Sequence, residues 1–77
     1  MQVIKRNGEK ADFTLVKIND VIMKAFTATQ MSYTNDIIDL LALRVTADFQ
    51  DKVKEDAIHV EDIQDSVERV LGQAGYE

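Results

Sequence analysis

The feature that most constrains the fold of this chain is the dipeptide Asn7-Gly8, which lies between two short segments suited to strands. Both residues tolerate the positive φ angles of a type I′ turn, so Asn-Gly strongly favours a two-residue β-hairpin loop. The sequence therefore predicts strands at residues 2–6 and 9–13, joined by a tight turn.

A two-residue turn also predicts the register of the hairpin. Lys5 would lie opposite Lys10, and Val3 would lie opposite Asp12. The face that packs on the rest of the chain would then hold Ile4, Ala11 and Phe13. Two like charges directly across a hairpin cost a few tenths of a kcal/mol unless an anion lies nearby, so the two lysines hint at a ligand.

Three later segments show the 3.6-residue apolar period of amphipathic helices. They span residues 15–29, about 35–54 and 60–74. Their expected N-cap residues are Thr14 for the first, Thr34 or Asn35 for the second and His59 for the third. Residues 57–59 are too few for a helix and predict a third strand added to the hairpin. The expected fold class is α+β, with a hairpin and a third short strand capping a small bundle of three to four helices.

The composition excludes several classes of function. The 77 residues make one small domain, and the absence of cysteine excludes disulfides, thiolate metal sites and cysteine nucleophiles. Three glycines cannot form a phosphate-binding loop, and one histidine argues against a His-based metal centre. The net charge of −5 argues against a nucleic-acid partner, and no apolar run suits a membrane span or a signal peptide. We expect a cytoplasmic domain with no catalytic residues and no metal site.

The charges are unevenly distributed along the chain. Residues 1–24 carry five basic and three acidic groups, whereas the remaining 53 residues carry four basic and eleven acidic groups. An anion site should therefore lie in the first third, although a solvated basic edge is the alternative. Lys17 falls in the first turn of a predicted helix, where the macrodipole disfavours a cation unless an anion is bound. An ordinary exposed lysine is the alternative there.

Three motifs occur in a recognisable order along the chain. They are Val3–Gly8, then Phe13 with Lys17–Ile18, and finally Ile58–Glu68. They resemble the patterns V-x-K-R-[DN]-G, F-[DN]-x-x-K-[IL] and [IV]-[ST]-V-E-[ED]-I-Q-D of the ATP-cone. This family is a regulatory nucleotide-binding domain at the N-terminus of many ribonucleotide reductases, and it also occurs in a transcriptional repressor of the reductase genes. The resemblance spans nearly the whole chain.

The segment Val70–Tyr76 is similar to the version found in the oxygen-sensitive, glycyl-radical ribonucleoside-triphosphate reductases. In those enzymes the helical region continues into the catalytic domain. The resemblance therefore implies that residues 1–77 are a single ATP-cone domain and an N-terminal fragment of a longer reductase. Such a fragment is not an enzyme on its own, because the cysteines that reductase chemistry needs would lie downstream.

The resemblance implies that ATP or dATP, with Mg²⁺, binds between the sheet and the helix ends. There it would act as the allosteric effector that controls the overall activity of the reductase. The implied partners are an adenine nucleotide, the rest of the reductase chain and its oligomeric partners, with no nucleic acid and no membrane. The implied phosphate ligands are Lys5, Arg6 and Lys17. The other implied site residues are Val3 and Asn7 on the hairpin, Thr14 beside the base or sugar, and His59, Val60 and Gln64 at the last helix.

Three positions depart from the family pattern. Ala11 stands where some members carry a glutamate, Thr14 replaces an aspartate or asparagine, and His59 replaces a serine or threonine. These departures leave the preference between ATP and dATP open. Two other functions also stay open. One is the cone of the transcriptional repressor, for which a zinc ribbon upstream of Val3 would be expected, and the other is a helix-packing interaction module that has lost nucleotide binding.

Overall fold

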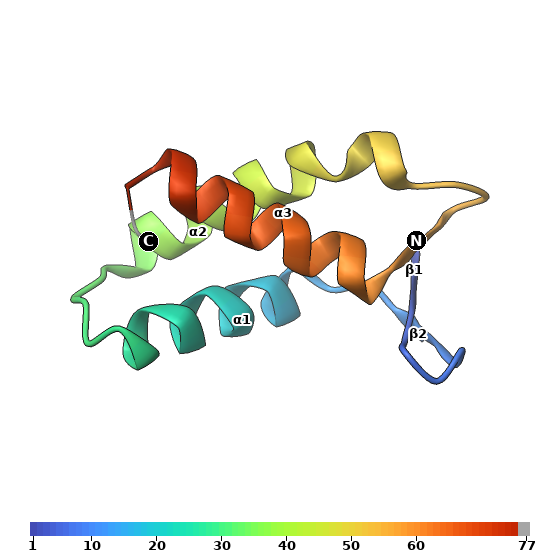
Figure 1. Ribbon diagram of the computed structural model, residues 1–77, viewed down its shortest axis with the longest axis horizontal. Helices are drawn as coiled ribbons and strands as arrows, with labels where there is room; N and C mark the ends of the chain where they lie inside the picture. The colour runs from blue at the N-terminus through green and yellow to red at the C-terminus, as the bar shows by residue number, and fades with distance from the viewer. Residues whose placement is uncertain (76–77) are drawn as a thin grey trace.

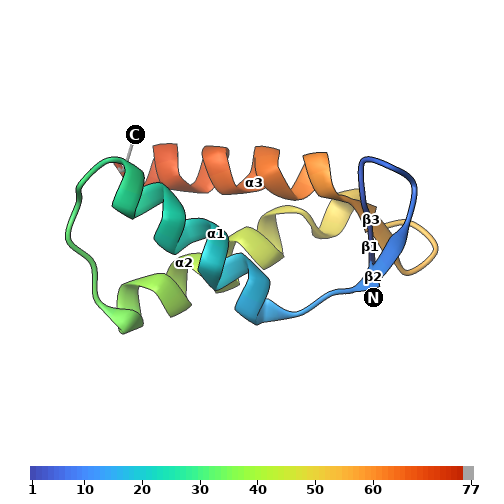
Figure 2. The same ribbon diagram turned by 90° about the horizontal axis from the view of Figure 1, so that it is seen from below.

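The computed structural model describes residues 1–75, with a small sheet at one end of three packed helices (Figures 1 and 2). In chain order the elements are β1 (Gln2–Ile4), β2 (Lys10–Asp12), α1 (Leu15–Ala28), α2 (Asn35–Asp48), a 3₁₀ helix η1 (Gln50–Lys52), β3 (Ala57–His59) and α3 (Val60–Gln73). The predicted α+β architecture is confirmed. No helix within residues 1–75 is long and apolar enough to cross a bilayer.

The sheet has the strand order β2-β1-β3, so the N-terminal strand occupies its centre. β1 pairs antiparallel with β2 and parallel with β3, where Gln2 lies beside Ala57 and Ile4 beside His59. The predicted third strand is thus confirmed, and α3 begins directly at its end. This pairing brings the start of α3 next to the hairpin.

The loop between β1 and β2 contains three residues, 6–8, rather than the predicted two. The Lys5 N–H donates to the Glu9 carbonyl at 2.7 Å, and the Gly8 N–H donates to the Lys5 carbonyl at 2.9 Å. Gly8 has φ +88°, and the Asn7 side-chain oxygen accepts the Glu9 N–H at 3.0 Å. A four-residue turn whose last residue is a left-handed glycine is a common three-residue hairpin connection.

The extra loop residue shifts the register by one and exchanges the faces of β1. Val3 lies opposite Ala11, and Ile4 lies opposite Lys10. The predicted pairing of Lys5 with Lys10 is therefore wrong, and so is the predicted inward face of Ile4. Val3 and Lys5 share the side of the sheet on which Ala11 lies, and all three line one cavity described below.

The end of α2 also differs from the prediction. The helix stops at Asp48, before the expected end near residue 54, and η1 and a tight turn follow it. The Lys54 N–H donates to the Ala57 carbonyl at 2.9 Å, and the Ala57 N–H donates back at 3.0 Å. Between them Glu55 and Asp56 have φ +53° and +59°. The turn with two left-handed residues therefore occurs here and not at the Asn-Gly dipeptide.

The predicted helix boundaries mostly agree with the structure. Thr34 caps α2 by accepting a backbone N–H at 3.2 Å, whereas Thr14 and His59 precede α1 and α3 without a side-chain cap hydrogen bond. Gly75 has φ +84°, as expected after a helix. Tyr76, part of the quoted ending, lies outside the described residues.

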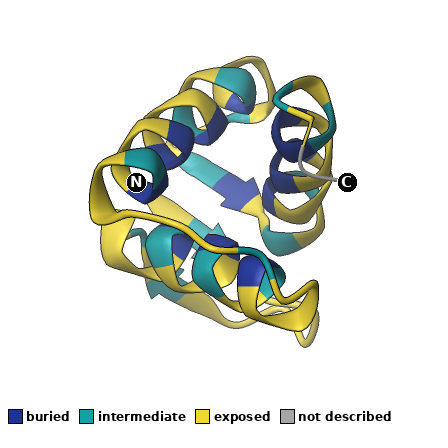
Figure 3. Ribbon diagram, turned by 90° about the vertical axis from the view of Figure 1, so that its left-hand side faces the viewer, coloured by how far each residue is buried: buried dark blue, intermediate teal, exposed yellow. Residues whose placement is uncertain are grey.

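The core is formed by apolar side chains from the three helices, the segment after α2 and β3. Its buried members are Ile18, Ile22, Phe26, Ile38, Leu41, Ala42, Val45, Phe49, Ile58, Ile63, Val67, Val70 and Leu71. Figure 3 shows the buried positions on the helix sides that face one another. Phe13 packs edge-on against Phe49 with ring centroids 5.8 Å apart, which fixes the chain after β2 to the bundle.

Candidate functional site

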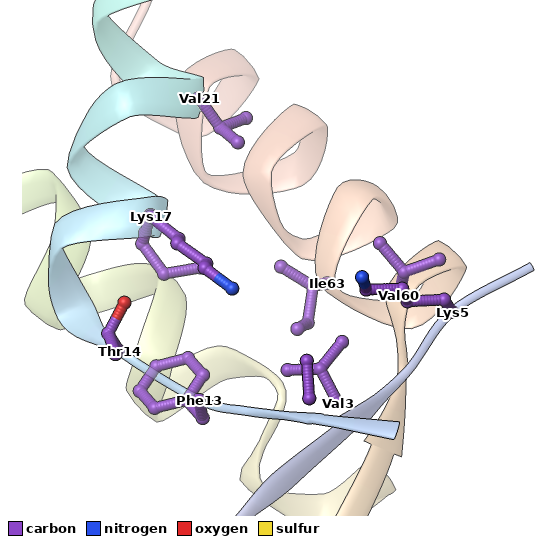
Figure 4. A pocket seen from close by; sticks show the side chains of 10 residues that line it. Val3, Lys5, Phe13, Thr14, Lys17, Val21, Val60 and Ile63 are labelled. Carbon is purple, nitrogen blue, oxygen red and sulfur yellow. The ribbon is translucent and has the colours of Figure 1, made fainter. Parts of the chain in front are cut away.

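A cavity of about 210 Å³ lies where the sheet, the start of α1 and the start of α3 meet (Figure 4). It is lined by Val3, Lys5, Ala11, Phe13, Thr14, Lys17, Ile18, Val21, Val60 and Ile63. Most of these side chains are apolar, and the polar ones are two lysines and one threonine. A concave, mostly apolar surface with a few polar groups is the usual form of a small-molecule site.

The apolar lining comes from three separate parts of the chain. In Figure 4 the side chain of Val3 on β1, the ring of Phe13 and the side chain of Ile63 on α3 converge on the same space. Val3 reaches it only because the three-residue loop shifts the hairpin register by one. These surfaces can enclose a flat, weakly polar group such as an aromatic base.

The cations of the cavity are Lys5 and Lys17, whose amino groups both point toward its open space (Figure 4). Lys17 belongs to the first turn of α1, and that turn contains no acidic residue. Within residues 1–75 neither lysine forms an ion pair. Two cations without an ion-pair partner within residues 1–75, beside a helix start that has no side-chain cap hydrogen bond, suit a negatively charged ligand.

Arg6, the third predicted phosphate ligand, does not line the cavity. It lies in the hairpin loop, and its guanidinium donates to the side-chain oxygen of Gln64 at 2.9 Å. Its Nε also lies 3.4 Å from a carboxylate oxygen of Glu61. Both partners lie in the first turns of α3, so Arg6 and Gln64 meet each other beside the cavity.

Comparison with known proteins identifies the family. The family model of the ATP cone domain matches residues 1–77, which is the whole chain. The chain belongs to the ATP-cone family. A curated relative is the ribonucleoside-diphosphate reductase subunit alpha of Chlamydia pneumoniae, which is 38% identical over 84 residues. That match covers 96% of this ATP-cone and 8% of the relative, so the chain spans a small part of that protein's length.

The other predicted site residues of this ATP-cone divide into two groups. Thr14 and Val60 line the cavity together with the residues above. Asn7 does not line it, because its side chain is used inside the hairpin loop. His59 lines a separate surface hollow, which it shares with Ile4 and Asp62.

Several lining residues were not predicted as site residues. All of these are apolar: Phe13, Ile18, Val21 and Ile63. The helical period assigned Ile18 and Ile63 to the core and the predicted hairpin register assigned Phe13, whereas neither pattern made an assignment for Val21. On α1 the spacing of Thr14, Lys17, Ile18 and Val21 is i, i+3, i+4 and i+7, which marks one helix face. The sequence signal that could have indicated a site on this face is the presence of two polar residues, Thr14 and Lys17, beside the apolar Ile18 and Val21.

Within residues 1–75 of this ATP-cone, no three His, Cys, Asp or Glu side chains gather in a way that could hold a metal ion. None of the residues that line the cavity is a carboxylate. A divalent cation at this site would therefore depend on oxygen atoms supplied by a ligand.

Proposed function

We propose that this ATP-cone binds ATP or dATP in the cavity as an allosteric effector of a ribonucleotide reductase. The observation that carries the proposal is the pair of lysines, Lys5 and Lys17, which point into a mostly apolar cavity and have no ion-pair partner within residues 1–75. A nucleotide combines a flat base with a polyanion, and each charge-assisted hydrogen bond to a phosphate contributes about 1.5–3 kcal/mol. Membership of the ATP-cone family and the similarity to a reductase subunit support the same function.

The size of the cavity suggests how the nucleotide lies. A volume of about 210 Å³ is below the roughly 300–1,000 Å³ of most ligand pockets. We therefore expect the base and sugar to enter the apolar part near Phe13 and Ile63, while the phosphates extend past Lys5 and Lys17 toward Arg6. Mg²⁺ would be bound through the phosphates, because the lining residues include no carboxylate.

The wider setting is part of the proposal. The domain would be the N-terminal regulatory part of a longer reductase, acting on the rest of that chain and its oligomeric partners in the cytoplasm. It would contact no nucleic acid or membrane. The Val70–Tyr76 segment favours a glycyl-radical triphosphate reductase, whereas the curated relative is a diphosphate reductase subunit. The sequence of the full-length gene product tests this, since only the first class would carry a glycyl-radical motif.

A helix-packing interaction module without nucleotide binding is the second candidate function. Leu40 and Leu43 on α2 are 59% and 58% exposed, and their i, i+3 spacing puts them on one side of the helix, where a partner could cover them. Ala11 lines the cavity where some family members carry a glutamate, and this removes one polar contact to a base. A measurement of nucleotide binding distinguishes the two candidate functions, because only the first requires it.

Thermal unfolding with ATP, dATP or GTP, each with magnesium, tests the proposed function. A ligand at 100 times its dissociation constant adds about 2.7 kcal/mol to the free energy of unfolding. For a domain of this size the melting temperature should rise by about 10–20 °C with an adenine nucleotide, and far less with GTP. The absence of any shift at millimolar ATP and dATP would refute nucleotide binding by these residues.

A further inference from the structure

The ion pair between Arg6 and Glu61 separates Arg6 from the two lysines. Of the three cations expected to bind phosphate, Arg6 is the one that pairs with a carboxylate within residues 1–75. Glu61 supplies the charge at 3.4 Å, and Gln64 supplies a neutral acceptor at 2.9 Å. The guanidinium thus has an anionic partner within the protein itself.

The position of this ion pair relates it to the cavity. Arg6 directly follows Lys5 on the hairpin, and Glu61 directly follows Val60 on α3. Lys5 and Val60 both line the cavity, and the residues directly before them, Ile4 and His59, pair in the sheet. The ion pair therefore lies at the edge of the cavity. This is the side on which the phosphates of a bound nucleotide would extend out of the cavity.

A phosphate and a carboxylate compete for the same donors of a guanidinium. The side chains of Arg6 and Glu61 are 68% and 59% exposed, and such exposed ion pairs are weak. A triphosphate carries more charge than one carboxylate and can displace it. Displacement still subtracts the energy of the existing pair from the binding energy.

We propose that Glu61 is an affinity-determining residue that competes with the nucleotide phosphates for Arg6. This inference rests on the proposed function. In the free domain Arg6 is held on α3 by Glu61 and Gln64, and on binding it exchanges the carboxylate for a phosphate oxygen. Glu61 thereby raises the nucleotide concentration at which the site fills.

Calorimetric titration of ATP into Glu61→Gln tests the proposal. The amide keeps the size of the side chain but removes the competing charge, so we expect about two- to fivefold tighter binding than in the wild type. Asp62→Asn is the matched control, because it removes the same charge from the same turn of α3. Asp62 lines the separate hollow with His59 and has no bond to Arg6.

The effect must also depend on Arg6. In an Arg6→Gln background, Glu61→Gln should leave the affinity unchanged, since the donor for which both anions compete is gone. If loss of the first-turn charge unfolds Glu61→Gln, Glu61→Asp replaces it. That variant keeps the charge near the helix start but shortens the reach to Arg6, and it should also bind more tightly than the wild type.

Three results would overturn the proposal. Equal gains for Glu61→Gln and Asp62→Asn would show a general charge effect, and a gain that persists without Arg6 would show that Arg6 is not the contested group. Weaker binding by Glu61→Gln would mean that the carboxylate orients Arg6 toward the nucleotide. A wild-type domain that binds no adenine nucleotide would instead refute the proposed function, so the two failures are distinguishable.

Discussion

At the scale of single residues, the positions of the two lysines of the cavity are set by the hairpin loop and by the start of α1. Lys5 follows β1 and lines the cavity because the hairpin loop has three residues. Lys17 lies in the first turn of α1, where the helix dipole mildly disfavours a cation. Neither lysine has an ion-pair partner within residues 1–75, so no salt bridge of the described residues is lost when either is replaced.

We predict that Lys5→Gln and Lys17→Gln each weaken ATP binding by about 1.5–3 kcal/mol, because each removes a charge-assisted contact. Without ligand, the free energy of unfolding should be unchanged for Lys5→Gln. For Lys17→Gln it should be unchanged or slightly raised. Lys10→Gln and Lys24→Gln are the controls, since neither residue lines the cavity. Calorimetry at fixed salt measures all four, and equal affinities would show that the basic segment is only a solvated edge.

A second residue-scale prediction concerns the contact between α2 and α3. The Arg69 guanidinium donates to Asp48, with Nε 3.1 Å from one carboxylate oxygen, and these hydrogen bonds hold the pKa of Asp48 below its ordinary value of 3.8. A carboxyl whose pKa is lowered by folding stabilises the folded state above its unfolded pKa, and this contribution is lost as the pH falls through the folded pKa.

Asp48→Asn should therefore lower the melting temperature by about 2–5 °C at neutral pH. Below pH 3.8 the difference from the wild type should shrink, because the wild-type carboxyl becomes protonated as well. Thermal melts of both proteins across this range measure the effect. A difference that stays constant from neutral to acid pH would contradict the assigned role of the charge.

At the scale of elements, the hairpin loop determines which side chains of β1 reach the cavity. Gly8 has φ +88°, a conformation that side chains with a Cβ adopt at a cost, although no atom lies within 4 Å of the place where a Cβ would be. The cost of a substitution there is therefore a backbone cost and not a steric clash.

We predict that Gly8→Ala lowers the free energy of unfolding by about 1 kcal/mol, and that Gly8→Asn lowers it by less, because asparagine tolerates left-handed backbone. Both variants should also bind ATP less tightly, since a distorted loop moves Lys5. Denaturant unfolding and titration of the two variants provide the measurement. Equal stability of Gly8→Ala and the wild type would show that the loop adopts another conformation.

The same loop shows how far the sequence could predict this structure. The period of the apolar residues gave the three helices correctly, and the short run before α3 gave β3. The Asn-Gly dipeptide correctly predicted a hairpin but not its register, because a left-handed Gly8 suits a three-residue loop as well as a two-residue one. In the observed register the side chains of Val3 and Phe13 pack against the core.

The candidate site was less predictable than the fold. Apolar residues that line the cavity, such as Ile18 and Ile63, have the same helical spacing as residues buried in the core, so periodicity does not distinguish them. Lys5 and Lys17, which the family motif assigns as phosphate ligands, line the same cavity, and their role in binding stays a prediction. The motif did not indicate that Arg6 pairs with Glu61, because that contact joins residues far apart in the chain.

At the scale of the whole molecule, a domain of 77 residues has little stability in reserve, roughly 3–5 kcal/mol. Phe49 is fully buried at the end of α2 and contacts the ring of Phe13. Removing a buried aromatic ring costs about 3–5 kcal/mol. One such change is therefore comparable with the total stability of the domain.

We predict that Phe49→Ala is largely unfolded without ligand and regains helix content when ATP is added at saturating concentration, because binding favours the folded state. Far-UV circular dichroism measures both states. Val16→Ala is the control, since Val16 is 66% exposed and its truncation should leave the helix content unchanged. A folded Phe49→Ala, or an unfolded one that ATP does not rescue, would contradict this prediction.

The parallel pairing of β1 with β3 has a consequence for the order of folding. Gln2 pairs with Ala57, and closing a chain of that length costs about 3–4 kcal/mol of entropy, whereas α1 and α2 are neighbours in sequence and in space. Contacts between distant residues form late. On the ribosome the two-helix segment can assemble first, but the cavity cannot exist until Val60 and Ile63 have emerged. A nascent chain therefore cannot bind a nucleotide in this cavity until nearly all of the domain has been synthesised.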